Sequence, residues 1–476
     1  MSAYGAAAAD RRLAGVSVAA MGSGVVLALA GAATGNVGLA VGGGAAAGIA
    51  LVLLMAPRWI DPLLIVTLAA PLPAVWSSDG VRVAAAAPVT AAACAAWVLY
   101  RAGSRDGIQA GTLPTRLLGL LGLVFVLATA AAPAPLLAAR ELLNLAVLAG
   151  LLFLATDLFS ETPRLRERVA TLLAVLGVAC AALAVLETLG VIPGTFPRYG
   201  TPFNRAALGF GQPNGLGLFL ALVLPLIAWR AAEAPRAKIW VWRAGLGIAA
   251  AGLLATFSRG AWGSTIAGAA ALAAAGAWRR SARIVFGALI GALALDVVSG
   301  GMVRDTIART VGDWVVEQRA ALMLAGILMF LDRPWLGFGP GGFETELDHY
   351  GIQVPDLWDF QPTPHNAYVQ MAAEQGALGS ILYVALLVAL VRRAATAARG
   401  PERPADAPLA RALLWSLGIL IVSGFFIWPF AHGTGEVVIL LVALVASAPA
   451  AEPAPIGVAT PSVGAPSVVV AGAPVQ

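Results

Sequence analysis

Long stretches of apolar residues, separated by short polar segments, make up most of this chain. They occur near residues 14–34, 37–56, 62–77, 83–100, 117–132, 137–156, 169–191, 213–229, 244–257, 261–277, 284–299, 366–391, 412–429 and 434–448. A helix needs about 20 apolar residues to cross the hydrocarbon core of a bilayer. The pattern therefore predicts an all-α, polytopic bundle of about 12 to 14 transmembrane helices. The many Ala and Gly residues favour close helix packing in lipid.

The first apolar stretch admits two interpretations. Arg11 and Arg12 precede apolar residues that end near residue 30, an arrangement that also occurs in cleaved signal peptides. The stretch is long and a second one follows at once, so we favour a first transmembrane helix.

Composition excludes an ordinary soluble domain. Of the 476 residues, 59% are hydrophobic and 12% are charged, whereas soluble domains carry about 25% charged residues. The net charge of +5 does not indicate a nucleic-acid partner, because the basic residues form short clusters between apolar stretches. Cys94 and Cys180 lie within apolar stretches, and we interpret both as small buried hydrophobic residues.

The arginine clusters predict the orientation of the bundle. With the N-terminus inside, alternate loops at 101–116, 164–168, 230–243, 279–283 and 392–411 hold most of the positive charge, as cytoplasmic loops do. Fourteen crossings would place both termini in the cytoplasm. The same alternation places residues 300–364 on the outer side.

The pattern divides the chain into four parts. We expect about 11 spans in 1–299, a large periplasmic loop at 300–364, about three spans in 365–448 and a disordered tail at 449–476. Within the loop, residues 314–331 have the pattern of an amphipathic helix, and a Gly/Pro-rich stretch follows at 334–343. A loop of this length is usually functional or disordered, and its aromatic residues favour an ordered, functional loop.

A set of polar residues near the outer ends of the predicted helices could carry chemistry. The candidates are Arg205, Asn214, Arg259, Arg319, His365, Asn366 and Glu374. Several guanidinium groups on one face suit a diphosphate, because arginine stays charged and makes bidentate contacts with phosphate oxygens. A histidine on that face can accept a proton from a hydroxyl nucleophile.

Each candidate also has a structural interpretation. Arg205 and Arg319 could be solvated loop charges. Arg259 could be a snorkelling residue at a helix end. His365 could cap a helix or bond a backbone carbonyl. Glu374 is harder to dismiss, because an ionisable group about two and a half turns into an apolar helix is costly and usually functional or paired.

These segments together resemble the O-antigen ligase and O-antigen polymerase family of bacterial envelope glycosyltransferases. The best match is Arg319, then Pro-Trp-Leu-Gly-Phe-Gly-Pro-Gly-Gly-Phe at 334–343, then His365-Asn366 and Glu374-Gln375-Gly376 with Gly379. Phe-Ser-Arg-Gly-Ala at 257–261 looks like the family's Ser-Arg-Gly segment. Arg205 with Pro213-Asn214 looks like its upstream Arg and Pro-Asn pair. The resemblance covers about 190–390, and the earlier helices match by topology only.

The resemblance implies a glycosyltransferase type C-like fold in the bacterial inner membrane. It implies a polyprenyl-diphosphate-linked glycan as donor, used on the outer face, with no cofactor and no metal. Arg205 and Arg259 would bind the diphosphate, and His365 would act on the acceptor hydroxyl. Arg319, Asn214, Asn366 and Glu374 would bind substrate.

We therefore expect an O-antigen ligase-like glycosyltransferase. A polysaccharide polymerase and a protein glycosyl ligase of the same family remain open, because the acceptor could be a lipid-A core, a growing glycan or a protein. A lipid or polysaccharide transporter would favour charges near the midplane and paired repeats, and we find no repeat. A metal-dependent oligosaccharyltransferase would use the acidic cluster of Glu344, Glu346, Asp348 and His349.

Overall fold

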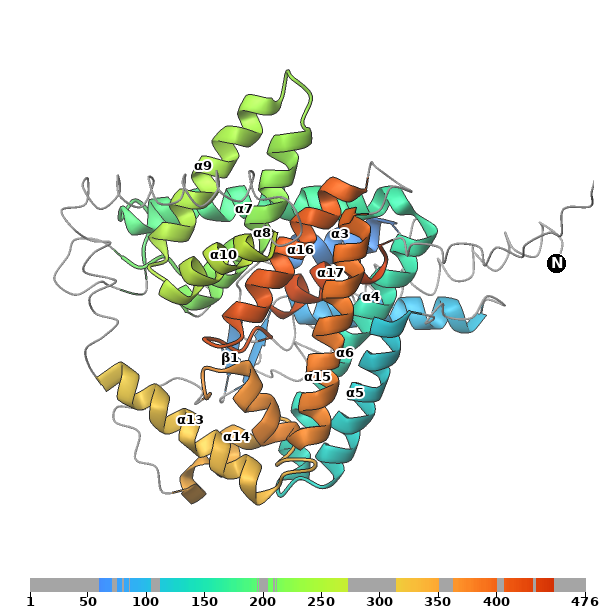
Figure 1. Ribbon diagram of the computed structural model, residues 1–476, viewed down its shortest axis with the longest axis vertical. Coiled ribbons are helices and arrows are strands. Elements are labelled where there is room, and N and C mark those ends of the chain that lie inside the picture. The colour runs from blue at the N-terminus through green and yellow to red at the C-terminus, as the bar shows by residue number, and fades with distance from the viewer. Residues whose placement is uncertain are drawn as a thin grey trace, which may run out of the picture.

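The computed structural model describes the chain from residue 60 to residue 448, with gaps. The described residues are 60–70, 75–78, 81–84, 86–103, 112–194, 196, 204–208, 210, 212–272, 314–350, 363–399, 406–430 and 434–448. They form a bundle of helices with one small antiparallel hairpin, β1 (Val75–Ser78) and β2 (Val81–Ala84) (Figure 1). The all-α, polytopic fold predicted from the apolar stretches is thus confirmed.

Five helices in the described part of the chain are long and apolar enough to cross a membrane. They are α5 (Leu113–Ala130), α6 (Pro135–Glu161), α7 (Pro163–Thr188), α8 (Pro213–Glu233) and α15 (Ala367–Arg399). Other helices accompany them: α3 (Ile60–Ala69), α4 (Ala86–Gly103), α9 (Ile239–Ala255), α10 (Arg259–Leu272), α16 (Ala407–Ser423) and α17 (Gly435–Ala446). The stretches at 14–34, 37–56 and 284–299 and the tail at 449–476 lie outside the described residues, so the total of 12 to 14 spans stays a prediction.

One predicted span is wrong. The stretch at 62–77 does not form a single helix, because α3 ends at Ala69 and strand β1 begins at Val75. Pro71 and Pro73 lie between the two elements. Proline lacks the N–H that a helix interior requires and clashes with the preceding turn, so an apolar run with two prolines does not continue as a helix.

The centre of the bundle is α8, which packs against α7, α9 and α16. In the most apolar 18-residue segment of α8, 83% of the residues are buried. In the corresponding segments of the other four long helices, 39% to 44% are buried. Small residues allow α7 and α9 to approach each other closely, as the sequence predicted for helices rich in Ala and Gly. A methyl group on Gly252 of α9 would lie 2.7 Å from the Ala181 carbonyl oxygen of α7, which is closer than ordinary van der Waals contact.

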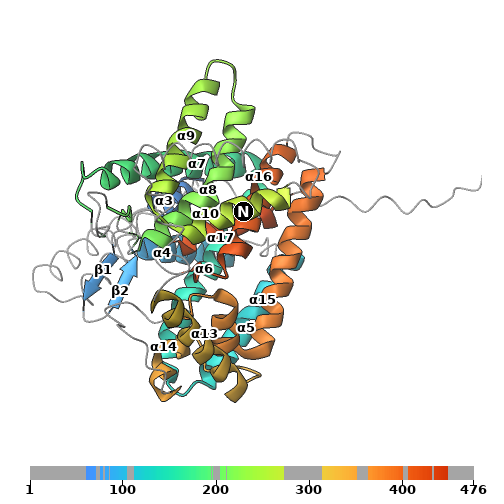
Figure 2. The same ribbon diagram turned by 60° about the vertical axis from the view of Figure 1, so that its left-hand side comes forward.

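The predicted amphipathic helix of the large loop is confirmed as α13 (Trp314–Asp332). After a Gly/Pro-rich turn come α14 (Gly342–Glu346) and the 3-10 helix η3 (Leu347–Tyr350). Helices α13 and α14 pack against α15 at one end of the bundle, beside α5, and η3 packs against α13 and α14 (Figure 2). Buried Phe338 and Phe343 fill a small separate core between the turn and α13.

The opposite end of the bundle is held by charged side chains. Arg101 of α4 donates from Nε to Asp157 of α6 at 2.8 Å, and Trp97 Nε1 donates to the same carboxylate at 2.9 Å. Arg230 at the end of α8 pairs with Glu167 at the start of α7 at 2.9 Å. These arginines come from loops that the sequence assigns to the cytoplasmic side.

Two further arginines from that side cap α17. Arg166 Nη2 donates to the Leu444 carbonyl oxygen at 3.2 Å, and Arg393 Nη2 donates to the Ala448 carbonyl oxygen. The last carbonyls of a helix lack internal partners and carry partial negative charge, so guanidinium groups stabilise them. The arginines that the sequence assigns to the cytoplasm therefore lie at one end of the bundle. The C-terminal ends of α7, α9 and α16 lie at the other end (Figure 1).

Candidate functional site

Arg205 lies in a short segment between α7 and α8 and reaches the end of α9. Its backbone N–H donates to the Phe196 carbonyl oxygen at 2.8 Å. Its guanidinium donates from Nε to the Thr256 carbonyl oxygen at 3.3 Å and from Nη2 to that of Phe257 at 3.5 Å. Carbonyl groups at a helix C-terminus favour a cation, so this half-buried side chain is held beside the α9–α10 turn.

Arg259 begins α10 immediately after that same turn. Phe257 has a left-handed φ of 49°, and the Ser258 N–H donates to Thr256 Oγ1 at 3.2 Å. The turn is pressed against α8, since a methyl group on Gly217 would lie 2.9 Å from Ser258 Cβ. The turn that Arg205 contacts is therefore the one that leads directly into Arg259.

Arg319 on α13 is the third arginine of this region. Burial and the positive charge of Arg259 lower the pKa of Arg319. The two guanidinium groups therefore lie within electrostatic range of each other, although 60 residues separate them. No salt bridge to Arg319 occurs among the residues that the structure describes. Like charges near each other in a partly buried site repel, so such a pair is suited to binding an anion.

His365 and Asn366 form the entry to α15. Asn366 Oδ1 accepts the N–H groups of Tyr368 at 3.0 Å and Val369 at 3.1 Å, which is the geometry of a helix N-cap. The interpretation of His365 as the helix cap is thus wrong, because Asn366 fills that position. His365 has a left-handed φ of 49° and is half-buried.

The turn after α16 packs between the segment that follows His365 and the segment that follows Arg259. Here the Ala367 N–H donates to the Gly424 carbonyl oxygen at 2.7 Å, and the Tyr368 and Phe425 rings lie 4.6 Å apart. On the other side of the turn, a methyl group on Gly260 would lie 3.1 Å from Phe426 Cβ. The structure therefore brings the segments of Arg205, Arg259, Arg319 and His365 together, at the end opposite Arg101, Arg166, Arg230 and Arg393.

Asn214 is the second residue of α8, close to the start of the same region. It is half-buried and lies one turn before Gly217, whose contact with Ser258 is described above. The partial positive charge of a helix N-terminus adds to that of the arginines.

Glu374 has different surroundings from the other candidates. It is 6% exposed, and the backbone N–H groups of Gly341 and Phe343 face its carboxylate. Gln370 Nε2 also donates to Glu374 Oε1 at 3.3 Å. These contacts link Glu374 of α15 to the start of α14.

The Gly/Pro-rich turn and the Glu-Gln-Gly segment form one structural unit. Helix α15 is interrupted at Gly376, whose φ is 63° and ψ is −161°. The turn docks there through backbone hydrogen bonds: the Phe338 N–H donates to the Ala373 carbonyl oxygen at 3.0 Å, and the Ala377 N–H donates to that of Pro334 at 2.7 Å. This unit fixes α13, which carries Arg319, to α15, which follows His365.

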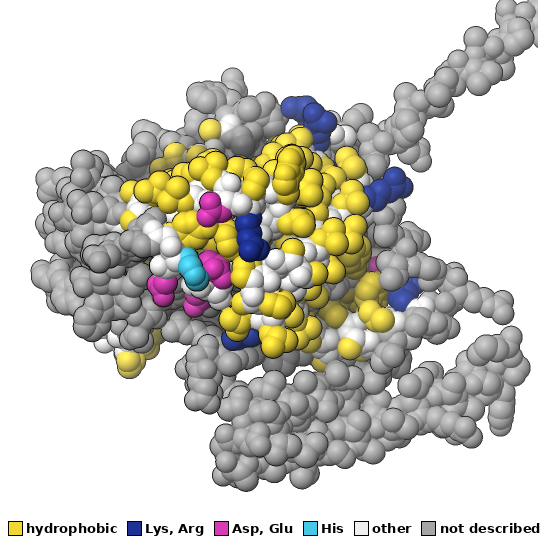
Figure 3. Space-filling model, turned by 90° about the horizontal axis from the view of Figure 1, so that it is seen from below, with side chains coloured by type: hydrophobic (Ala, Val, Ile, Leu, Met, Phe, Trp, Pro, Cys, Tyr) yellow, Lys and Arg dark blue, Asp and Glu magenta, His cyan; other side chains and the backbone are white. Residues whose placement is uncertain are grey.

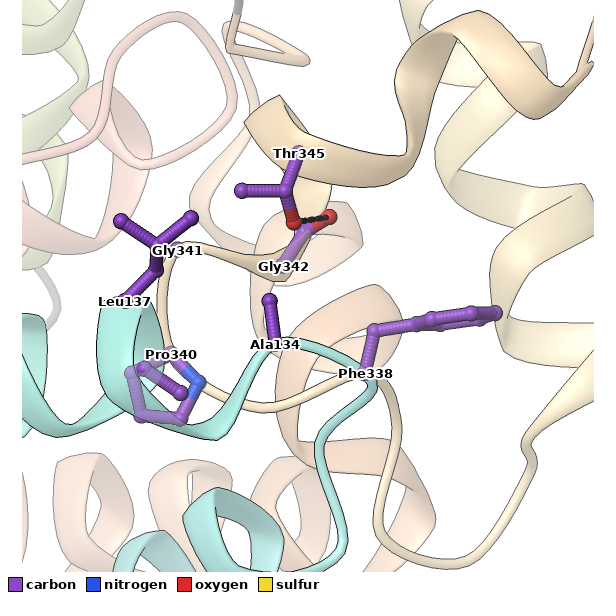
Figure 4. Close-up of a pocket in the computed structure, with 8 residues that line it drawn as sticks. Ala134, Leu137, Phe338, Pro340, Gly341, Gly342 and Thr345 are labelled. Atoms are coloured by element: carbon purple, nitrogen blue, oxygen red, sulfur yellow. Dashed lines mark hydrogen bonds between the residues drawn. The ribbon is translucent and has the colours of Figure 1, made fainter.

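Two other features of the loop end lack the chemistry of a diphosphate site. A shallow hollow between α6 and the turn is lined by apolar residues, glycines and Thr345 (Figure 4). On the face shown in Figure 3, acidic side chains and a histidine stand out from apolar surroundings. Glu346 lies 3.3 Å from His349, and no three such groups within the described ranges are placed to hold a metal.

Residues 244–384 match the O-antigen ligase family model. The family resemblance found in the sequence is thus confirmed for this part of the chain. The matched segment contains Arg259, Arg319 and His365, whereas Arg205 and Asn214 precede it. No curated protein matches the chain.

The O-antigen ligase match and the apolar helices support two general statements. The chain is a multi-pass membrane protein. Its segment 244–384 is similar to the O-antigen ligase family, which is a family of ligase- or polymerase-type glycosyl-transfer enzymes.

Sequence reasoning did not single out Glu187, which contacts the segment of Arg205. This buried carboxylate accepts backbone N–H groups from the segment that carries Arg205. The signal was present in the sequence, because Glu187 interrupts the apolar stretch at 169–191. An ionisable residue inside an apolar stretch is costly and usually has a partner or a function.

Proposed function

We propose that this protein transfers a glycan from a polyprenyl-diphosphate carrier to an acceptor hydroxyl on the outer face of the inner membrane, as an O-antigen ligase does. The observation that carries the proposal is the distribution of backbone strain. In the described part of the chain, the non-glycine residues with left-handed φ are Leu208, Phe257 and His365. Each belongs to a segment of the candidate site. Such strain costs about 1–3 kcal/mol per residue and clusters at active sites.

The arginines supply what a departing diphosphate needs. When the bond between the anomeric carbon and the diphosphate oxygen breaks, its electron pair leaves with the diphosphate and increases the negative charge there. Arg205, Arg259 and Arg319 can stabilise that charge through bidentate, charge-assisted hydrogen bonds. The mutual repulsion of Arg259 and Arg319 would be relieved by the bound anion.

His365 would act on the acceptor. The acceptor hydroxyl oxygen forms the new bond to the anomeric carbon, and its proton passes to the imidazole. The Asn366 cap and the contact of Ala367 with the α16 turn hold the backbone next to His365. Such positioning is a large part of the rate advantage of enzymes.

We favour a ligase, and the polymerase and protein glycosyl ligase of the same family differ from it only in the acceptor. The transporter alternative has one point in its favour, the interruption of α15 at Gly376, because broken helices line transport sites. Here the backbone of the loop turn occupies the interruption through the Ala377 and Phe338 hydrogen bonds. A glycosyltransferase is therefore the better interpretation.

The test uses the purified protein in nanodiscs with fluorescent polyprenyl-diphosphate N-acetylglucosamine. Lipid-A core, oligosaccharide and protein acceptors are offered separately, and we expect label to move to one of them. The acceptor that receives the label also separates ligase, polymerase and protein ligase. Movement of intact labelled lipid across vesicle membranes, without transfer to any acceptor, would instead establish a flippase.

A further inference from the structure

Glu187 is a buried carboxylate in an unfavourable place. It is the second-last residue of α7 and is 3% exposed. The last turn of a helix carries partial negative charge from its unpaired carbonyl groups, which disfavours a carboxylate. Burial of an ionised group adds a further cost unless hydrogen bonds stabilise the charge. A residue with both costs needs specific partners.

Its partners are backbone N–H groups of the segment that carries Arg205. Glu187 Oε2 accepts from the Ala207 N–H at 3.0 Å and from the Leu208 N–H at 2.9 Å. Asn204 Nδ2 donates to the backbone carbonyl oxygen of Glu187 at 3.4 Å. Hydrogen bonds to an ionised acceptor are about twice as strong as neutral ones. One carboxylate thus anchors the segment just after Arg205 and holds Leu208 at its left-handed φ of 45°.

The other side of the segment is fixed to α9. The Ala206 N–H donates to the Ala255 carbonyl oxygen at 3.1 Å, and Thr188 Oγ1 donates to the same oxygen at 3.2 Å. The segment is therefore clamped between the ends of two helices. The clamp leaves the Arg205 guanidinium directed to the Thr256 and Phe257 carbonyl groups, in the turn before Arg259.

We propose that Glu187 is a positioning residue for glycan transfer, which acts by holding the Arg205 segment on the end of α7. The inference rests on the proposed function and adds a residue that works through Arg205. Glu187 neither contacts the substrate nor moves a proton in this role. Its carboxylate fixes the position of the Arg205 backbone relative to the end of α7, and so the place where Arg205 would bind the diphosphate.

The test is a double-mutant cycle on kcat/KM for transfer from polyprenyl-diphosphate N-acetylglucosamine, with Glu187→Gln, Arg205→Ala and the double variant. Glutamine loses the charge, so the two N–H donors are left with a neutral amide oxygen, which is a weaker acceptor than a carboxylate. A displacement of about 1 Å can cost about a hundredfold in rate, so Glu187→Gln should lower kcat/KM by about tenfold to a hundredfold. In the Arg205→Ala background, the same change should cost less than about twofold. An undiminished loss in that background, or a parental kcat/KM for Glu187→Gln, would overturn the proposal.

Two further variants separate positioning from folding. Asp157→Asn alters a carboxylate that is equally buried but lies at the cytoplasmic end, and it should lower thermal stability without changing the donor KM. Glu187→Asp keeps the charge and should recover part of the lost kcat/KM. If neither Glu187 variant can be recovered folded, the carboxylate serves stability and the proposal is wrong. A parent protein that transfers nothing, or Arg205→Ala with parental transfer, would refute the proposed function first, and the inference would fall with it.

Discussion

Replacement of Gly376 by alanine tests whether the loop turn and α15 form one unit. The backbone at Gly376 has φ 63° and ψ −161°, a region that is nearly restricted to glycine and costs other residues about 1–3 kcal/mol. The new methyl group would also lie 2.6 Å from the Leu336 N atom and against the Trp335 backbone. To avoid this clash the turn must move away from α15. The movement breaks the hydrogen bond from the Ala377 N–H to the Pro334 carbonyl oxygen, which is worth about 1 kcal/mol.

The two contributions predict that Gly376→Ala loses about 2–4 kcal/mol of stability. The assay is thermal unfolding of the purified protein in detergent, together with limited proteolysis of the segment 334–350. The variant should unfold at a lower temperature, and a protease should cleave the segment faster. Transfer activity should fall too, because the unit holds the helix of Arg319 next to the helix that follows His365.

Gly122→Ala is the matched control. Gly122 lies on α5, and a methyl group there would meet nothing within 4 Å. Alanine in a helix interior is favoured over glycine by about 0.5–1 kcal/mol, so this variant should be as stable as the parent or more so. Equal unfolding temperatures and equal protease resistance for the two variants would refute the docking of the turn on α15.

Three further predictions concern single side chains. Arg259→Lys keeps the charge but loses the bidentate fork, so the rate of transfer should fall by at least about tenfold. Arg243→Lys, at the end that the sequence assigns to the cytoplasm, should leave the rate unchanged. Equal losses in both variants would indicate that a general positive potential, and not a specific site, binds the donor. His365→Gln cannot accept the acceptor proton and should lose about a hundredfold in kcat with donor binding retained; near-parental kcat would exclude proton transfer by His365. Glu374→Ala leaves the Gly341 and Phe343 N–H groups without an acceptor and should destabilise the protein by about 1–3 kcal/mol. Asp348 is exposed, so Asp348→Ala should leave the stability unchanged. Identical unfolding temperatures for the two variants would contradict the anchoring of α14 by Glu374.

Periodicity and length were sufficient for the fold class and for one loop element. The amphipathic pattern at 314–331 predicted a helix that the structure has at Trp314–Asp332. The arginine clusters predicted a common side, and Arg101, Arg166, Arg230 and Arg393 meet at one end of the bundle. These predictions succeed because membrane insertion acts on local hydrophobicity and charge.

The contacts of the site depend on long-range packing that sequence alone does not reveal. Nothing in the sequence indicates that Arg205 donates to carbonyl groups 51 and 52 residues away. The contacts of Glu374 with Gly341 and Phe343 could not be predicted for the same reason, since these residues lie more than 30 positions earlier in the chain. The stretch at 62–77 failed for a local reason, because hydrophobicity was weighed above its two prolines. The assignments of catalytic and binding roles stay predictions.

Equilibrium binding of polyprenyl diphosphate tests the central claim most directly, because it isolates the role of the arginine end from the chemistry of transfer. Parent, Arg259→Ala, Arg319→Ala and the cytoplasmic-end control Arg243→Ala are compared, with polyprenyl monophosphate as a second ligand. Loss of a charge-assisted hydrogen bond costs about 1.5–3 kcal/mol, which is about a tenfold to hundredfold change in Kd. The account predicts that change for Arg259→Ala and Arg319→Ala, no change for Arg243→Ala, and a preference of the parent for the diphosphate. Equal Kd values for all four proteins would contradict it.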